Sequence, residues 1–299
     1  MQARPSSHYP THTQISSFLS GFLSPTSHDL PFHYHHPLHP LYNPSNNPVR
    51  HLVLALHPSI TTYHLLSQPH TAAFLHRPFS LNRRRIRRGN LVLASHTAFD
   101  AALTVGYNIH LASHLGLDVE RGESRCVQGY KGDAERKIGI VGLLDRPESV
   151  VVMLGRVRGE FGGEGELFLP PVSGRNVVAD AKIEAETAVV DQQAQGLSDR
   201  QIKVLAIMNA FHAEEVRRVI DVSVEARWTA AESAGKEILY LTGAARPYGL
   251  EAAAAHDMSA FCVGHLACEK WGIRFLADRM REEFPGLDVQ EIYEEEEIK

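Results

Sequence analysis

Short runs of apolar residues recur along this chain, and they limit more than any other feature what it can fold into. The runs are continuous rather than alternating and are rich in Val, Ile and Leu: Leu52–Leu56, Ala72–Leu75, Leu91–Ala94, Ile138–Leu144, Val150–Leu154, Ile238–Leu241 and Ala260–Val263. Strands that are buried on both faces have this pattern, and such strands usually belong to parallel sheets covered by helices. The sequence therefore predicts an α/β fold with a layered, mostly parallel sheet flanked by helices.

Helical patterns separate several of these runs. Ser198 and Gln201 have the spacing of a capping box, so we expect a long helix to begin there and to continue to Val219. Apolar residues within Ile273–Phe284 recur at helical spacing, which predicts a last helix with one side packed in the core.

The first 48 residues differ in composition from the rest. Pro, Ser, His and Asn dominate, so we expect a partly disordered, irregular N-terminal arm over 1–48, with disorder over 1–10 and one short helix over Ile15–Leu23. The body over 49–299 is expected to form an α/β domain, either undivided or built from two lobes. The lobes would cover 49–125 with 236–299, and 126–235.

Overall composition excludes several classes of protein. The formal net charge of −5 argues against a protein that coats nucleic acid. No run of about 18 apolar residues is present, so we expect no membrane span. The three cysteines form no C-x-x-C motif and favour a reducing compartment. We therefore expect a cytoplasmic protein, with the nucleus as the alternative. A mitochondrial leader is less favoured, because only Arg4 precedes Asp29 as a strong positive charge.

Two further segments have both a binding and a structural interpretation. His33–His39 contains four histidines, which suit either an adventitious metal site or a polar loop. We favour the loop, because no carboxylate lies nearby in the sequence. Arg83–Arg88 contains five arginines, which suit either phosphate contacts or a solvated connection between strands. We favour the connection, and we do not expect nucleic acid as a partner.

Three of the predicted strands end next to a histidine. His76 follows one strand directly, while His96 and His265 each stand two residues beyond another, with Asp100 and Glu269 four residues further on. Open α/β sheets bind their ligands at the carboxyl ends of strands. Imidazoles together with carboxylates suit Zn²⁺, Mn²⁺ or Fe²⁺. The strand ends therefore predict a divalent metal site.

Each of these residues also has a purely structural interpretation. Thr97 and Asp100 have capping-box spacing, so Asp100 would serve only the start of a helix. Glu269 would complement a helix N-terminus, and His76 would be a hydrogen-bonded core histidine. We prefer the metal site because three separate strand ends share the pattern.

Several motifs resemble those of the Nif-three-like family, whose members are also described as homologues of GTP cyclohydrolase one type two. Val263–Ile273 looks like the family's G-H-x-x-x-E segment, and His96–Ala102 looks like its H-T-x-x-D-A-A segment. Thr242–Gly243 stands where the family has a T-G loop. The resemblance covers roughly residues 49–292 and implies the family's α/β fold and closed, ring-like homo-oligomers.

The resemblance also implies a set of metal ligands, which are His76, Asp100, His265 and Glu269. His96 would orient a ligand or act as the general base of catalysis. Arg77 stands where the family has the second histidine of His-His-Pro. The literal His35-His36-Pro37 is no substitute, because it precedes the first strand of the body.

Arg77 changes the charge of the expected site. A guanidinium is permanently charged and does not ligate metals. Two divalent ions and Arg77 against two carboxylates would leave an excess of about +3, so we expect a single ion, with Arg77 gripping an anionic substrate. The implied activity is metal-dependent hydrolysis of a phosphorylated or nucleotide-like small molecule. The alternative is a metal-binding interaction or regulatory protein without catalysis, favoured by Arg77 and by Ala244–Pro247 after the T-G pair.

Overall fold

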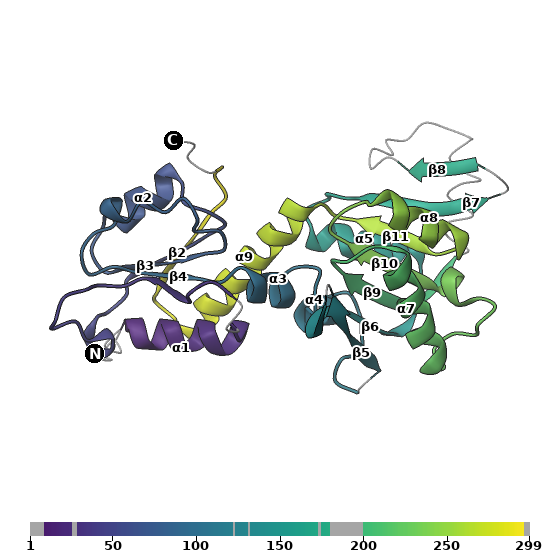
Figure 1. Ribbon diagram of the computed structural model, residues 1–299, viewed down its shortest axis with the longest axis horizontal. Helices are drawn as coiled ribbons and strands as arrows, with labels where there is room; N and C mark the ends of the chain where they lie inside the picture. Colours follow the sequence, from purple (N-terminus) through teal and green to yellow (C-terminus); the bar gives the residue numbers. More distant parts are fainter. Residues whose placement is uncertain are drawn as a thin grey trace, which may run out of the picture. The chain divides into compact units, whose positions relative to one another are not determined.

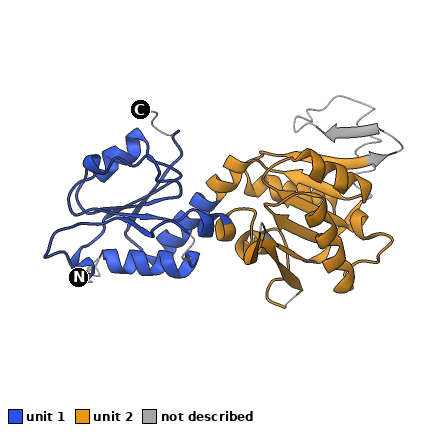
Figure 2. Cartoon of the chain, viewed as in Figure 1, with its two compact units in different colours: residues 1–100, 272–299 blue, residues 101–271 orange. Residues whose placement is uncertain are grey.

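The computed structural model describes residues 9–25, 29–121, 123–130, 132–172, 175–179 and 200–295. It divides the chain into two compact units (Figure 2): unit 1 comprises residues 1–100 with 272–299, and unit 2 comprises residues 101–271. Both units contain a sheet accompanied by helices (Figure 1), so the predicted α/β class is confirmed. The single expected sheet is in fact two sheets, one in each unit.

Unit 1 contains a five-stranded sheet in the order β1-β4-β3-β2-β12. The strands are β1 (His33–His35), β2 (His51–Ala55), β3 (Thr71–Leu75), β4 (Leu91–Ala94) and β12 (Asp288–Ile292). β12, β2, β3 and β4 are parallel neighbours, and β1 pairs antiparallel with β4. Every residue of β3 and β4 is buried, as the continuous apolar runs predict for central parallel strands.

The N-terminal arm is more ordered than the sequence predicts. Helix α1 (His12–Leu23) begins at a capping box formed by Thr11 and Gln14, and its apolar side is buried. Strand β1 extends the sheet beyond β4. Helix α1 packs aromatic side chains against Phe275 and Phe284, and β1 forms hydrogen bonds with the edge of β4. These contacts explain why this Pro-rich stretch is not irregular throughout. The residues 1–8, which include most of the expected disorder, lie outside the described residues.

The remaining elements of unit 1 are short. Helix α2 (Ile60–Leu66) and the 3-10 turns η1 (Pro44–Asn46) and η2 (Arg83–Arg85) connect the strands. The guanidinium of Arg83 lies over the ring of Tyr34, and that of Arg85 lies over Tyr63. These contacts agree with the interpretation of the arginine run as a connection between strands.

Unit 2 contains a seven-stranded mixed sheet in the order β5-β6-β9-β10-β11-β7-β8. The strands are β5 (Ser124–Tyr130), β6 (Asp133–Ser149), β7 (Glu166–Val172), β8 (Arg175–Ala179), β9 (Gln201–Met208), β10 (Ile238–Thr242) and β11 (Ser259–Cys262). Only β9, β10 and β11 are parallel to one another. The other pairs are antiparallel, so the mostly parallel arrangement holds for unit 1 and for the centre of unit 2.

Among the described residues, four helices lie wholly within unit 2: one precedes β5 in the sequence, and the other three, with a 3-10 turn, lie between its strands. They are α4 (Ile109–His114), α5 (Val150–Glu160), α7 (Ala213–Glu225), α8 (Pro247–Ala255) and the turn η3 (Ala234–Glu237). Helices α3 (Thr97–Leu103) and α9 (His265–Glu283) each contain a boundary between the units. None of the helices in the described ranges is long and apolar enough to cross a membrane.

Two predictions of secondary structure in unit 2 are wrong. Residues 150–154 belong to α5 rather than to a strand: Ser149 caps the helix, and Val150, Met153 and Val157 are buried at helical spacing. Gln201–Met208 is the strand β9 rather than the start of a helix, because its apolar residues are buried in succession. The expected cap at Ser198 lies outside the described residues.

Candidate metal centre

The carboxyl ends of β3 and β4 bring three polar side chains together. The two strands are parallel neighbours, with Leu75 opposite Ala94 at their ends. His76 follows β3 directly, His96 stands two residues beyond β4, and Asp100 lies in the first turn of α3. All three residues belong to unit 1.

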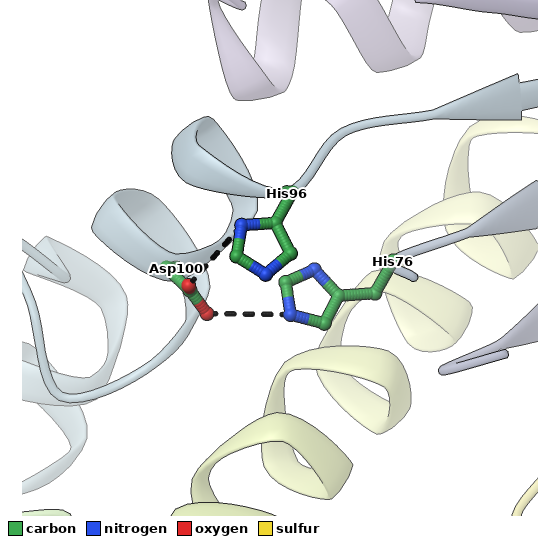
Figure 3. A group of neighbouring side chains, drawn as sticks. All are labelled: His76, His96 and Asp100. Atoms are coloured by element: carbon green, nitrogen blue, oxygen red, sulfur yellow. Dashed lines mark ion pairs between the residues drawn. The ribbon is translucent and has the colours of Figure 1, made fainter. Parts of the chain in front are cut away.

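The three side chains offer one donor atom each within 4.8 Å of one another. His76 Nε2 lies 3.4 Å from Asp100 Oδ1, and His96 Nδ1 lies 3.9 Å from Asp100 Oδ2. Figure 3 shows both imidazoles facing the carboxylate, which comes from the helix, while the histidines come from the strand ends. The two rings are stacked, with centroids 4.7 Å apart and planes 5° from parallel. Within the described part of the chain, this is the one cluster of its kind.

The surroundings of His76 fix the orientation of its ring. The side chain is fully buried, and its Nδ1 lies 3.1 Å from the carbonyl oxygen of Ser95. Because a carbonyl only accepts, Nδ1 is the nitrogen that donates to it, and Nε2 is the nitrogen on the side of Asp100 that would ligate a metal. An imidazole oriented in this way by a backbone carbonyl is the usual arrangement of a histidine that ligates a metal.

His96 is more open to solvent than His76, with 38% of its side chain exposed. Burial lowers its pKa, and the charges of His76 and Arg77 lower it further, against the opposing effect of Asp100 and Asp29. A lowered pKa keeps the imidazole neutral near neutral pH, which is the state that ligates a metal or accepts a proton. The donor set therefore fits a divalent cation that accepts nitrogen and oxygen ligands.

Asp29 is a residue of this region that the sequence does not reveal. Its carboxylate accepts hydrogen bonds from the backbone N–H groups of His96, Thr97 and Ala98, at the start of α3. Burial raises the pKa of Asp29, but hydrogen bonds from the Ser95 hydroxyl and from nearby backbone groups outweigh burial and lower it. The alternative interpretation of Thr97 and Asp100 as a capping box does not match the helix, since Thr97 is already its first residue.

His265 and Glu269 lie one turn apart at the start of α9, in the part that belongs to unit 2. His265 Nε2 lies 3.1 Å from Glu269 Oε1; the carboxylate is 1% exposed, whereas the histidine exposes 65% of its side chain. The pair thus exists as expected. That it meets His76 and Asp100 around one ion stays a prediction.

Arg77 follows His76 and is half-buried, with its backbone N–H donating to the carbonyl of Leu56. Thr242–Gly243 stands at the end of β10, and Pro247 then begins α8. Among the described residues, the segment His33–His39 contributes to no group of three side chains that could share a metal ion.

Comparisons with known proteins place these features in a family. A model of the family described as Duf34/NIF3 (NGG1p interacting factor 3) matches residues 51–297. The protein TTHA1606 from Thermus thermophilus is 14% identical, with a TM-score of 0.53 over 96% of this chain and 100% of that protein. Reduced HcgD from Methanocaldococcus jannaschii is 15% identical, with a TM-score of 0.54 over 94% and 97%.

A Bacillus cereus protein related to NIF3 is 13% identical, with a TM-score of 0.53 over 95% of this chain and 97% of that protein. At these identities the solved structures establish a similar fold. None of the curated proteins matches the sequence.

Proposed function

The chain belongs to the Duf34/NIF3 family, and from that premise we propose that it binds one divalent metal ion and hydrolyses a phosphorylated or nucleotide-like small molecule. The observation that carries this proposal is the placement of three donor atoms within 4.8 Å at two adjacent strand ends. Zn²⁺, Mn²⁺ and Fe²⁺ all suit imidazole and carboxylate ligands.

His76 and Asp100 are the core of the proposed ligand set. His76 presents Nε2 from a buried ring with a fixed orientation, and Asp100 presents its carboxylate from α3. His265 and Glu269 are proposed to join them, as the family resemblance implies. A divalent ion held by such a set would polarise the scissile bond and lower the pKa of a water molecule.

His96 has two roles that an experiment can separate. As a neutral imidazole beside Asp100, it is either a third ligand from unit 1 or the general base that accepts a proton during hydrolysis. Replacement by alanine would lower metal affinity in the first case. In the second case, metal affinity would be retained and turnover would be lost. We propose the second role because this side chain is the more exposed of the two histidines.

The positive charge of Arg77 is an argument for a site with a single metal ion and an anionic substrate. Its charge acts on His96, whose pKa it lowers, so the guanidinium lies within electrostatic range of the cluster. A second divalent ion there would be repelled by this permanent positive charge. The guanidinium would instead bind a phosphate or carboxylate with two parallel hydrogen bonds.

Metal analysis of the purified full-length protein, combined with a panel of phosphoesters and nucleotides, tests the proposal. We expect one tightly bound ion per chain, and turnover that disappears on chelation and returns when metal is added. Two tightly bound ions would refute the single-ion site, and the absence of any bound ion would refute the proposal as a whole.

A metal-binding interaction protein without catalysis is the second candidate. It is favoured by Arg77 in the position of a family histidine and by Ala244–Pro247 after the T-G pair. One bound ion without turnover of any compound would support it. The family resemblance also suggests a ring-like homo-oligomer, which light scattering of the purified protein would test.

A further inference from the structure

The carboxylate of Asp29 is attached to the start of the helix that carries Asp100, although it comes from the N-terminal arm. We propose that Asp29 is a positioning residue of the metal centre, which sets how His96 and Asp100 face His76. Asp29 precedes the residues 51–297 that the family model matches. The inference rests on the metal site proposed above and assigns a function to the arm.

Four hydrogen bonds attach Asp29 to this turn. Its Oδ1 accepts from the backbone N–H of His96 at 2.9 Å and of Thr97 at 3.0 Å. Its Oδ2 accepts from the backbone N–H of Ala98 at 3.0 Å and from the hydroxyl of Ser95 at 2.6 Å. A carboxylate that satisfies three consecutive backbone donors and a hydroxyl leaves the turn little freedom to shift.

Helix α3 is capped from two sides: the hydroxyl of Ser95 accepts from the backbone N–H of Phe99 at 3.3 Å, and Asp29 accepts from the three N–H groups before it. The helix has only 7 residues, which is too short to be stable without outside contacts. Its acidic residue in the first turn, Asp100, lies against His76 and His96. The acceptor for the first three N–H groups of this turn therefore comes from a residue that is 66 positions away from Ser95 in the sequence.

The capped turn carries His96 and Asp100, whose positions relative to His76 determine the geometry of the proposed metal site. His96 donates its backbone N–H directly to Asp29, and Asp100 follows one helical turn later, with its N–H donating to the carbonyl of His96. A metal site tolerates displacements of about 0.5 Å in its donors before affinity suffers. Loosening the first turn of α3 would therefore displace Asp100, the proposed ligand, together with His96, the proposed general base, while His76, on the neighbouring strand end, would stay in place.

Substitution of Asp29 by asparagine tests the inference in the full-length protein. Asparagine has the same shape, but it loses the charge and turns one acceptor into a donor that faces other donors. We expect Asp29→Asn to weaken the binding of Zn²⁺ or Mn²⁺ by about 10-fold or more, measured by competition with a chelator. Asp29→Glu keeps the carboxylate and should recover part of the affinity.

Ser59 offers a matched control in the same unit. Its hydroxyl accepts from the backbone N–H of Thr62 and caps α2, which also has 7 residues and carries none of the three donors. Ser59→Ala should lower the melting temperature by a few degrees, as a lost cap does, while metal affinity stays within twofold of the wild type. Equal effects of Ser59→Ala and Asp29→Asn on affinity would show a merely structural role and overturn the inference.

Hydrogen exchange of the metal-free protein separates this inference from the proposed function. We expect the amides of Ala98, Phe99 and Asp100 to exchange faster in Asp29→Asn than in the wild type. If the wild type binds no metal, the proposed function fails, and the role of Asp29 in positioning α3 is then decided by exchange alone. The inference is overturned if Asp29→Asn exchanges these amides as slowly as the wild type. It is also overturned if the wild type binds metal and Asp29→Asn binds it equally tightly. If Asp29→Asn does not fold, Ser95→Ala removes one of the four bonds to Asp29, together with the bond from the N–H of Phe99 to the Ser95 hydroxyl, and should cause a smaller loss of affinity.

Discussion

The two units end a pair of parallel strands in different ways. In unit 1, the ends of β3 and β4 supply two imidazoles, and the helix that follows supplies a carboxylate. In unit 2, β10 ends at Thr242–Gly243 without an ionisable side chain, and only the helix after β11 supplies a histidine and a carboxylate. Both pairs of strands are parallel neighbours, so the two units differ here in how many donor side chains follow the strand ends.

The two sets of donors also differ in how firmly they are held. His76 is fully buried, with its ring oriented by the carbonyl of Ser95, and α3 is capped by Asp29. His265 exposes 65% of its side chain at the first position of α9. A site that is held before the ion arrives loses less entropy on binding. We therefore expect the donors of unit 1 to bind an ion more tightly than the pair on α9 does.

The largest expected effect is that of Asp100→Asn. This change removes the carboxylate that lies near both imidazoles, so metal affinity should fall by about 100-fold or more, as measured by chelator competition. Asp288→Asn is the matched control, because His51 and Asp288 form an exposed pair at 2.9 Å in the same unit. If Asp100→Asn binds metal as tightly as Asp288→Asn, the cluster in unit 1 is not the binding site.

Glu269→Gln should have a smaller effect, because it removes one carboxylate and leaves the cluster of unit 1 intact. We expect metal affinity to fall by about 10-fold. The control is Glu160→Gln, since Glu160 also accepts from other side chains of unit 2, with its Oε1 3.3 Å from His114 Nδ1 and its Oε2 2.8 Å from Trp271 Nε1. Affinity equal to that of Glu160→Gln would mean that the pair on α9 does not take part.

Arg77→His should change the number of bound metal ions rather than the affinity for the first ion. It removes the permanent positive charge and supplies an imidazole next to His76, as in the His-His-Pro pattern of the family. We expect the metal content to rise from one ion per chain to two, measured by mass spectrometry of the metal. Arg77→Gln, which removes the charge without adding a ligand, should keep one ion. A single ion in both variants would show that charge does not limit the site.

Sequence reasoning succeeded where one local pattern determined the structure. The runs before His76 and His96 predicted strands because a central parallel strand is apolar on both faces, and the strand-end rule then placed both histidines with Asp100. The run at 150–154 misled because a short apolar stretch is compatible with either element. Its helical spacing becomes visible only over the longer range from Val150 to Val157.

Asp29 was beyond the reach of such reasoning. A cap supplied from elsewhere in the chain leaves no spacing signal, because the donor turn and the acceptor are separated by more than sixty residues. The local alternative, a capping box from Thr97, satisfied the usual sequence rule and still does not match the helix. Long-range hydrogen bonds of this kind depend on tertiary packing, so only the folded arrangement reveals them.

Replacing His12 is expected to have the smallest effect on the metal centre. Its effect should instead be on the acid stability of unit 1, which can be followed separately from that of unit 2. This residue of α1 is 1% exposed, and its Nδ1 lies 2.8 Å from the hydroxyl of Tyr42. Burial, with a further contribution from the charge of His70, lowers the pKa of His12 to about 4. The unfolded chain binds this proton near pH 6.5, so the stability that comes from neutral His12 is complete above that pH and is lost as the pH falls toward 4.

We expect unit 1 to lose about 2 kcal/mol of its free energy of unfolding through His12 between these pH values, with metal removed by a chelator. Hydrogen exchange of α1 amides would report the loss. Both tryptophans, Trp228 and Trp271, lie in unit 2, so their fluorescence follows that unit separately. His12→Gln, which cannot titrate, should remove the change in α1 without altering the tryptophan signal. Equal protection of α1 at pH 7 and pH 4.5 in the wild type would contradict the prediction, and a loss of protection that persists in His12→Gln would assign the acid sensitivity to other groups.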